Sequence, residues 1–197
     1  PICIESERLA IRGVDEADLA DLLSINADDE VTRFLPYESW RSIEDGTAWL
    51  GRMKKLEESG TGAQLVVVEK ASGRAIGTCL LFRYDEASAR AELGYVLGRT
   101  HWGKGLMLET LSALVSGAFN TLALRRLEAE VNPSNVASCR LLERLGFAHE
   151  GRLRQRWMAK GSVYDTNLYG LLRDEWLAAQ PCATEKARSL AEQPGPV

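Results

Sequence analysis

Cysteine and histidine are scarce in this chain of 197 residues, and neither is arranged for metal or disulfide chemistry. The four cysteines are isolated from one another at Cys3, Cys79, Cys139 and Cys182. No C-x-x-C pair predicts a zinc knuckle or a redox dithiol, and two histidines, His101 and His149, are too few for a histidine metal cage. We therefore expect no bound metal and reduced thiols, as in a cytoplasmic protein.

Long apolar runs and an excess of basic charge are also missing. No stretch approaches the roughly 20 apolar residues that a helix needs to cross a membrane. Acids at Glu5 and Glu7 stand where a leader peptide would be basic. Lys and Arg number 24 against 28 Asp and Glu, which gives a formal net charge of −4 and argues against binding nucleic acid by neutralising its phosphates. We expect neither a nucleic-acid nor a membrane partner.

The remaining composition, 45% hydrophobic and 26% charged, is typical of one folded domain. Apolar or alternating runs predict strands at residues 8–12, 64–70, 75–84, 89–97, 126–131, 148–159 and 162–172. Helices are predicted after the capping residues Asp15 and Ser42, over about 105–119, and from 134 to Gly146. Short loops favour antiparallel hairpins, while strand–helix–strand units require some parallel pairing, so the expected fold class is α/β with a mixed sheet.

The glycine-containing segment from Gly98 to Gly105 joins a predicted strand to a predicted helix. Glycines allow a ligand to approach the backbone closely, and free amides at the start of a helix bind phosphate. A loop from a strand to a helix can also contain glycines only because the chain turns there. Residues 98–104 satisfy G-x-x-x-x-G-K. Gly105 then stands where a nucleotide-binding P-loop has Ser or Thr, so the hydroxyl for Mg²⁺ is missing and this interpretation is disfavoured.

The run from Trp102 to Met107, WGKGLM, resembles the Q/R-x-x-G-x-G/A pyrophosphate loop of the GNAT superfamily of N-acetyltransferases, with departures at its first and last positions. The flanking segments strengthen the resemblance. AELGYVL at 91–97 looks like the family's E-x-G-Y strand, and NPSNVAS at 132–138 with LGF at 145–147 look like its N-x-x-S and L-G-F signatures.

The segment from Glu150 to Asp165 is similar to the branch that includes the ribosomal-protein N-terminal acetyltransferases RimJ and RimL, in which Trp at the first loop position is familiar. The resemblance covers about residues 7–176, which we expect to form one GNAT-like domain with a splayed central sheet. Residues 177–197, with three prolines, are expected to be a partly disordered extension.

The resemblance implies that acetyl-CoA is the co-substrate and lies between two parallel strands that part, Glu92–Leu97 and Arg126–Val131. The implied cofactor-binding residues are Tyr95, Val96, Leu97, Trp102, Gly103, Lys104, Gly105, Leu106, Met107, Asn135 and Ser138.

Three residues are candidates for catalysis by direct attack of an amine on the thioester in a ternary complex. Ser138 is expected to protonate the leaving thiolate, although a serine near a helix start can also satisfy its own backbone. Many relatives use a tyrosine where this chain has Leu142. Glu92 and Glu130 lie on the two parting strands as alternative general bases, and either is also consistent with an ion-pair carboxylate.

The acceptor pocket is predicted from aromatic residues in the irregular segment 28–40 and in the last hairpin: Phe34, Tyr37, Trp40, Trp157 and Tyr164. For any single one of these aromatics, packing in the core is the simpler expectation. The acceptor is expected to be a primary amine, either a protein N-terminal α-amine or a small molecule. A CoA-binding sensor or interaction module without turnover stays open, as does a homodimer.

Overall fold

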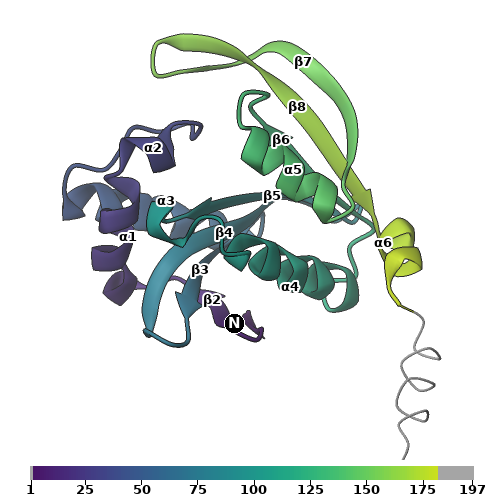
Figure 1. Cartoon of the computed structure of the whole chain (residues 1–197), viewed down its shortest axis with the longest axis horizontal. Helices are drawn as coiled ribbons and strands as arrows, with labels where there is room; N and C mark the ends of the chain where they lie inside the picture. Colours follow the sequence, from purple (N-terminus) through teal and green to yellow (C-terminus); the bar gives the residue numbers. More distant parts are fainter. Residues whose placement is uncertain (1, 182–197) are drawn as a thin grey trace, which may run out of the picture.

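An eight-stranded sheet organises residues 2–181, the part of the chain that the computed structural model describes (Figure 1). Its strands are β1 (Cys3–Glu5), β2 (Leu9–Gly13), β3 (Ala63–Glu69), β4 (Arg74–Asp85), β5 (Arg90–Leu97), β6 (Arg126–Val131), β7 (Ala148–Ala159) and β8 (Ser162–Leu172). The spatial order is β1-β2-β3-β4-β5-β6-β8-β7, and among the described strands only β5 and β6 pair in parallel. The predicted mixed α/β sheet is confirmed.

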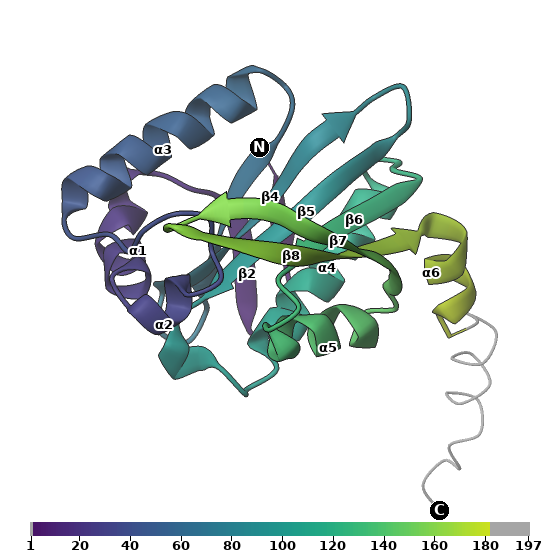
Figure 2. The ribbon, with the colours of Figure 1, turned by 90° about the horizontal axis from the view of Figure 1, so that it is seen from above.

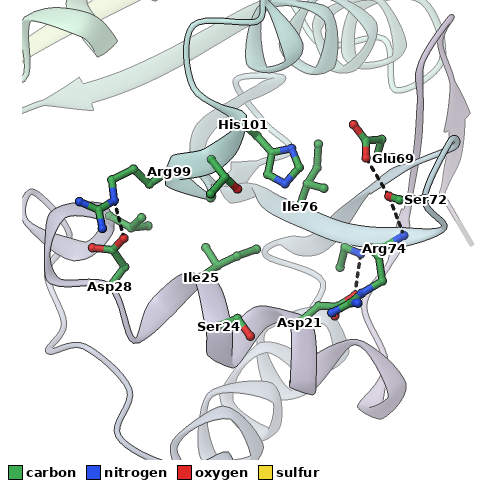
Figure 3. Close-up of a pocket in the computed structure, with 14 residues that line it drawn as sticks. Asp21, Ser24, Ile25, Asp28, Glu69, Ser72, Arg74, Ile76, Arg99 and His101 are labelled. Atoms are coloured by element: carbon green, nitrogen blue, oxygen red, sulfur yellow. Dashed lines mark hydrogen bonds and ion pairs between the residues drawn. The ribbon is translucent and has the colours of Figure 1, made fainter.

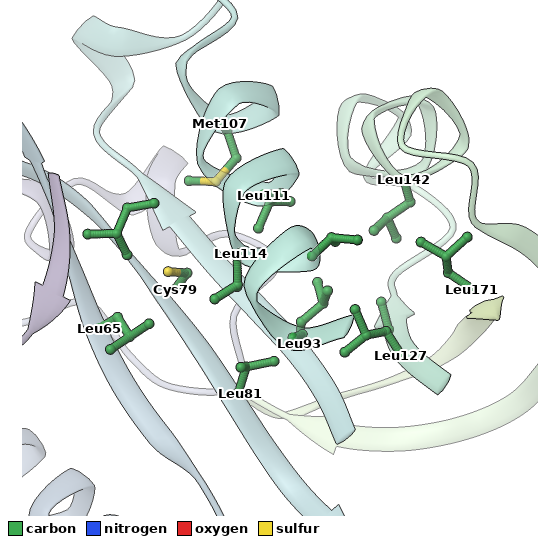
Figure 4. Packing of buried hydrophobic residues seen from close by; sticks show 14 of the residues in the cluster. Leu65, Cys79, Leu81, Leu93, Met107, Leu111, Leu114, Leu127, Leu142 and Leu171 are labelled. Carbon is green, nitrogen blue, oxygen red and sulfur yellow. The ribbon is translucent and has the colours of Figure 1, made fainter. Parts of the chain in front are cut away.

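Helices cover both faces of this sheet (Figures 1 and 2). They are η1 (Glu16–Asp18), α1 (Leu19–Asn26), α2 (Asp29–Thr32), α3 (Ile43–Glu58), η2 (Arg99–His101), α4 (Leu106–Asn120), α5 (Val136–Arg144) and α6 (Arg173–Ala179). Helix α4 packs on one face through buried residues such as Leu111 and Leu114 (Figure 4), and α1 and α3 pack on the other through Leu22 and Trp49.

Side-chain capping explains where the first helices begin. Asp15 accepts a hydrogen bond from the amide of Ala17 and completes a capping box with Asp18, while Ser42 and Asp45 form a second box at α3. These starts agree with the sequence, except that Asp15 caps the 3-10 turn η1, which leads into α1. Strand β1 and helix α2 were not expected. The segment of α2 is held by Asp28, whose carboxylate accepts from the amide of Glu30.

Strand β6 divides its side chains between the two faces of the sheet with the period of two expected for a strand. Leu127, Ala129 and Val131 are buried in the core beside α4. Glu128 and Glu130 therefore lie on the opposite face.

The pairing between β5 and β6 is short. It joins Arg90 to Arg126, Ala91 to Leu127 and Glu92 to Glu128, and it ends there. Strand β5 continues to Leu97 along β4, and β6 continues to Val131 along β8, so the two strands part beyond Glu92. The expected splay of the central sheet is present.

The hairpin of β7 and β8 arches away from the body of the sheet toward α2 (Figure 1). At its tip, Lys160 Nζ donates a 2.6 Å hydrogen bond to the carbonyl oxygen of Thr32. This contact ties the tip of the hairpin to the last residue of α2.

At the C-terminal end of the described chain, α6 continues to Ala179, beyond the expected boundary at Trp176. The helix is attached to the body of the fold through Trp176, whose ring lies 5.4 Å from that of Phe119 in α4. Most of the extension expected at 177–197 lies outside the described residues. Among residues 2–181, no helix is long and apolar enough to cross a membrane.

Candidate active site

A cleft of about 1000 Å³ opens where β5 and β6 part. Its walls come from these two strands, from the first turns of α4 and α5, from the segment after α2, and from the β7–β8 hairpin. Most of the residues singled out in the sequence line it: Phe34, Glu92, Tyr95, Val96, Leu97, Trp102, Gly103, Gly105, Leu106, Met107, Glu130, Asn135, Ser138, Trp157 and Tyr164. Lys104, Tyr37 and Trp40 do not.

The cleft wall formed by β5 is a strand edge without a neighbour beyond Glu92 in the described chain. Backbone amides and carbonyls at such an edge can pair with an extended ligand as they would with another strand. Leu93 to Leu97 supply this edge while their other side stays paired with β4.

The loop before α4 depends on left-handed glycines. Gly103 and Gly105 have φ of 72° and 74°, a region that residues with a Cβ rarely adopt. A Cβ on Gly105 would meet only Arg8 Nη2, at 3.7 Å, so the backbone conformation and not crowding requires glycine here. The first amides of α4 have no partner within the helix and are available to an anion.

Two contacts hold this loop in place. Trp102 Nε1 donates to the carbonyl oxygen of Leu97 at 2.8 Å, which ties the loop to the end of β5. Arg8 Nη1 donates to the carbonyl oxygen of Lys104 at 3.0 Å, and Arg8 Nε pairs with Glu109 Oε2 at 2.6 Å. The Lys104 side chain is exposed and lies outside the cleft lining, so its contact with the cofactor stays a prediction.

At the start of α5, Asn135 acts as the N-cap, because its side-chain oxygen accepts from the amide of Ser138 at 3.2 Å. The Ser138 hydroxyl is buried and hydrogen-bonds the hydroxyl of Tyr95 on β5. Burial raises the pKa of Tyr95 to about 12, so its hydroxyl stays protonated. Leu142 of α5, the position at which the sequence lacks a tyrosine, is fully buried in the core.

Two carboxylates face the same cleft. Arg83 Nη1 lies 2.6 Å from Glu92 Oε2 and 3.2 Å from Glu130 Oε1, so one nitrogen bridges them. Trp157 Nε1 donates to Glu130 Oε2 at 2.7 Å, and Arg156 Nη2 lies 3.8 Å from Glu130 Oε1. Burial is the main effect on the pKa of Glu92 and raises it, against the smaller lowering effect of Arg83.

Arg83 reaches this position because of a β-bulge in β4. The pairing with β5 jumps from Phe82–Glu92 to Asp85–Arg90, and Arg83 itself has a φ of 51°. In a regular strand Arg83 would project to the face opposite Phe82 and its partner Glu92. The bulge turns it back toward them. Sequence reasoning missed Arg83, since no residue type marks this bulge.

The acceptor-side aromatics divide into two groups. Phe34, Trp157 and Tyr164 line the cleft as expected. The expectation for the other two is corrected by their packing. Trp40 is 4% exposed and stacks 5.4 Å from Trp49 between α1 and α3. Tyr37 donates to Asn26 Oδ1 at 3.0 Å, and burial raises the pKa of its hydroxyl.

A smaller pocket of about 410 Å³ lies on the other side of His101 (Figure 3). Four of its charged groups form two ion pairs: Arg74 Nε with Asp21 at 2.7 Å and Arg99 with Asp28 at 2.8 Å. A further carboxylate, Glu69, accepts from Ser72 Oγ at 2.7 Å. His101 Nδ1 is buried there without a hydrogen-bond partner in the described chain. With both of its arginines paired, this pocket offers little to an anion.

Comparison with known proteins decides the family. Residues 8–148 match the acetyltransferase (GNAT) domain. The chain belongs to the GNAT acetyltransferase family. GNAT enzymes transfer an acetyl group to an amine, and this GNAT chain is accordingly an N-acetyltransferase. The mixed sheet, the splay and the glycine loop described above are the frame of that GNAT domain.

Two relatives of this GNAT domain have names that indicate an activity. The uncharacterized N-acetyltransferase p20 of Bacillus licheniformis is 34% identical over 171 residues, covering 87% of this chain and 96% of that protein. The [ribosomal protein uS5]-alanine N-acetyltransferase of Escherichia coli is 28% identical over 182 residues, covering 88% of this chain and 92% of that protein.

Among solved structures, RimJ of Mycobacterium smegmatis in complex with CoA-disulfide superposes with a TM-score of 0.83. The two chains are 20% identical, and the match covers 96% of this chain and 95% of RimJ. At this identity the likeness establishes a shared GNAT fold.

Proposed function

We propose that this enzyme transfers the acetyl group of acetyl-CoA to an α-amino group, of the kind found at a protein N-terminus. The observation that carries the proposal is the cleft between β5 and β6, which holds a hydroxyl pair and a carboxylate pair in one space. The uS5-alanine N-acetyltransferase among the relatives supports the α-amine.

The cleft fits acetyl-CoA in two respects. The free edge of β5 from Leu93 to Leu97 suits the amide groups of the pantetheine arm, which has the donors and acceptors of an extended peptide. The left-handed glycines Gly103 and Gly105 leave the first amides of α4 open to the pyrophosphate. About 1000 Å³ is ample for the arm and its thioester.

Ser138 and Tyr95 are placed to serve the leaving group. As the amine nitrogen bonds to the thioester carbonyl carbon, the carbon–sulfur bond breaks and the sulfur leaves as a thiolate. The Ser138 hydroxyl gives its proton to that sulfur and recovers one from Tyr95, whose raised pKa of about 12 keeps it protonated beforehand.

Glu92 is the proposed general base. Both oxygens of Glu130 are engaged, one by Arg83 and one by Trp157. In the described chain only Oε2 of Glu92 has a partner, so Oε1 is free to accept the proton of the attacking amine, directly or through water. Burial raises the pKa of Glu92, which makes it a better proton acceptor near neutral pH.

The acyl group passes directly to the amine in this scheme. Cys79 is fully buried and its thiol pKa is raised to about 12, which removes it as a nucleophile. Cys139 contacts Asn167 and lies outside the cleft lining. The cysteines Cys3, Cys79 and Cys139 are free thiols, which fits the proposed cytoplasmic location.

The test compares three acceptors at equal concentration with acetyl-CoA. One is a peptide with a free α-amine and no lysine, one is the same peptide with its N-terminus blocked and a lysine added, and one is a small primary amine. We expect turnover with the first at the highest kcat/KM. An α-amine, with its pKa near 8, loses its proton far more easily than a lysine near 10.4.

Faster acetylation of the blocked lysine peptide or of the small amine would overturn the α-amine proposal. Tight binding of acetyl-CoA by calorimetry, with no transfer to any amine, would overturn the assignment of Glu92 and Ser138 to catalysis and leave binding alone. Absence of acetyl-CoA binding would contradict the cleft assignment.

A further inference from the structure

We propose that Arg83 is a specificity-determining residue that occupies the position of a second cation in the acceptor site and thereby disfavours polyamine acceptors. The inference rests on the proposed function, since it deepens the choice of acceptor at that same cleft. It concerns the charge of the acceptor and not the acetyl donor.

One nitrogen atom of Arg83, Nη1, lies between the two carboxylates of the cleft. Arg83 Nη1 makes hydrogen bonds to Glu92 at 2.6 Å and to Glu130 at 3.2 Å. An ammonium group carries three donors on one nitrogen and would make the same two bonds from the same point. The cation needed between the carboxylates is therefore already supplied by the protein.

The charges of Glu92 and Glu130 are balanced by neighbouring arginines. The side chains of Glu92 and Glu130 are 8% and 13% exposed, so the two negative charges are little screened by water. Arg83 neutralises one of them, and Arg156 Nη2 lies 3.8 Å from the other. The two arginines and the two carboxylates together carry no net charge, so this group of side chains offers a polycation little attraction.

Aromatic rings surround the guanidinium of Arg83. Its guanidinium lies 5.4 Å from the ring centre of Phe82 and 5.9 Å from that of Trp157. Aromatic faces attract any cation placed over them. If Arg83 is removed, the remaining slot has two carboxylates and two ring faces, which is a good site for an organic ammonium.

The backbone at Arg83 has an unusual conformation. A φ of 51° at Arg83 is a rare conformation for a residue with a side chain, and the bulge turns this side chain into the cleft. Such strained positions persist where the surrounding structure holds them, and they concentrate at functional sites.

The experiment uses the full chain with Arg83→Met, which removes the charge and keeps much of the length, and Arg83→Lys, which keeps a cation. Arg83→Gln serves as a second neutral variant in case Arg83→Met does not fold. Arg90→Met is the matched control, because Arg90 pairs with Asp85 and Glu128 on the same sheet without touching Glu92 or Glu130.

Two quantities are measured for each variant: the Kd of spermidine by calorimetry in the presence of CoA, and the ratio of kcat/KM for spermidine to that for the α-amine peptide. We expect neutral variants to bind spermidine about tenfold more tightly, the effect of about one charged hydrogen bond. We also expect the ratio to rise about as much. Arg83→Lys and Arg90→Met should stay within about twofold of the parent.

A folded neutral variant whose spermidine Kd and acceptor ratio match the parent would overturn the inference. An equal rise in Arg90→Met would do so too, because it would trace the effect to net charge. The calorimetric measurement keeps the inference separate from the proposed function. If no peptide is acetylated, the function fails, while the change in spermidine binding still decides the role of Arg83.

Discussion

At the scale of single residues, the hydrogen bond between Tyr95 and Ser138 is the proton path that we propose for the leaving sulfur. We predict that Ser138→Ala lowers kcat about 100-fold, within the usual range for a lost general acid, while the KM for acetyl-CoA changes little. Steady-state kinetics with the α-amine peptide measure both. Ser112→Ala is the control, since its exposed hydroxyl bonds only to Leu108 of its own helix.

Tyr95→Phe should reproduce most of this loss, and the double variant should be no slower than the slower single variant, because both groups act on the same proton. Additive losses would mean that the two hydroxyls act independently.

In the proposed mechanism, the general base Glu92 determines how activity depends on pH. Below its pKa the carboxyl is protonated and cannot accept a proton, so activity falls on the acid side. Since burial raises that pKa, we expect the acidic limb of kcat/KM to lie above pH 4.5, the ordinary value for glutamate. The pH–rate profile measures it.

Glu92→Gln should lower kcat about 100-fold and remove this limb. Glu128→Gln, on the neighbouring strand and paired with Arg90 and Arg126, is the control and should keep the limb in place. A limb that survives in Glu92→Gln would transfer the role of base to another group.

At the scale of elements, the start of α4 depends on the left-handed conformation of Gly105. We predict that Gly105→Ala raises the KM for acetyl-CoA several-fold, because alanine costs about 1–2 kcal/mol in this conformation and shifts the first amides of α4. Titration of acetyl-CoA in steady-state kinetics measures the change.

Gly73→Ala separates strain from function. Gly73 has a similar φ of 67° with open space around it, in the turn between β3 and β4, away from the cleft lining. It should lower the melting temperature without changing the KM. Equal KM values in the two variants would mean that the loop is only structural.

Elements were largely predictable from the sequence because their signals are local. The alternation of apolar and polar residues in β6 indicates which side chains face the core. The caps at Asp15 and Ser42 mark where helices begin, and both signals need only a few neighbouring residues. Strand β1 is too short for its pattern to be distinctive.

The site was predictable where a side chain's position follows from its strand or helix, since Glu92, Glu130 and Ser138 line the same cleft. The position of Arg83 was not predictable, since the direction of its side chain depends on a β-bulge that no residue type marks. Trp40 was placed in the acceptor pocket because sequence does not tell an aromatic ring that lines a cleft from one that fills the space between two helices.

At the scale of the whole molecule, the cleft separates the sheet into two parts joined by only three residue pairs between β5 and β6. A ligand that contacts both parts stabilises the folded state against unfolding. We predict that acetyl-CoA at 100 times its Kd adds about 2.7 kcal/mol to the free energy of unfolding. Thermal melts over a concentration series measure it.

Acetate at the same ionic strength is the control and should leave the melting temperature unchanged. A melting temperature that is equally indifferent to acetyl-CoA would contradict binding across the parting strands.

The three-pair connection between β5 and β6 has a mechanical consequence. It lies at one end of the gap, so it can act as a hinge, and the opposite ends of the two strands have the greatest freedom to separate. A chain bound between them would continue the hydrogen-bond ladder from one part of the sheet to the other. We therefore expect bound acetyl-CoA to bridge the two parts of the sheet. The distance between β5 and β6 should then depend on the ligand that lies between them.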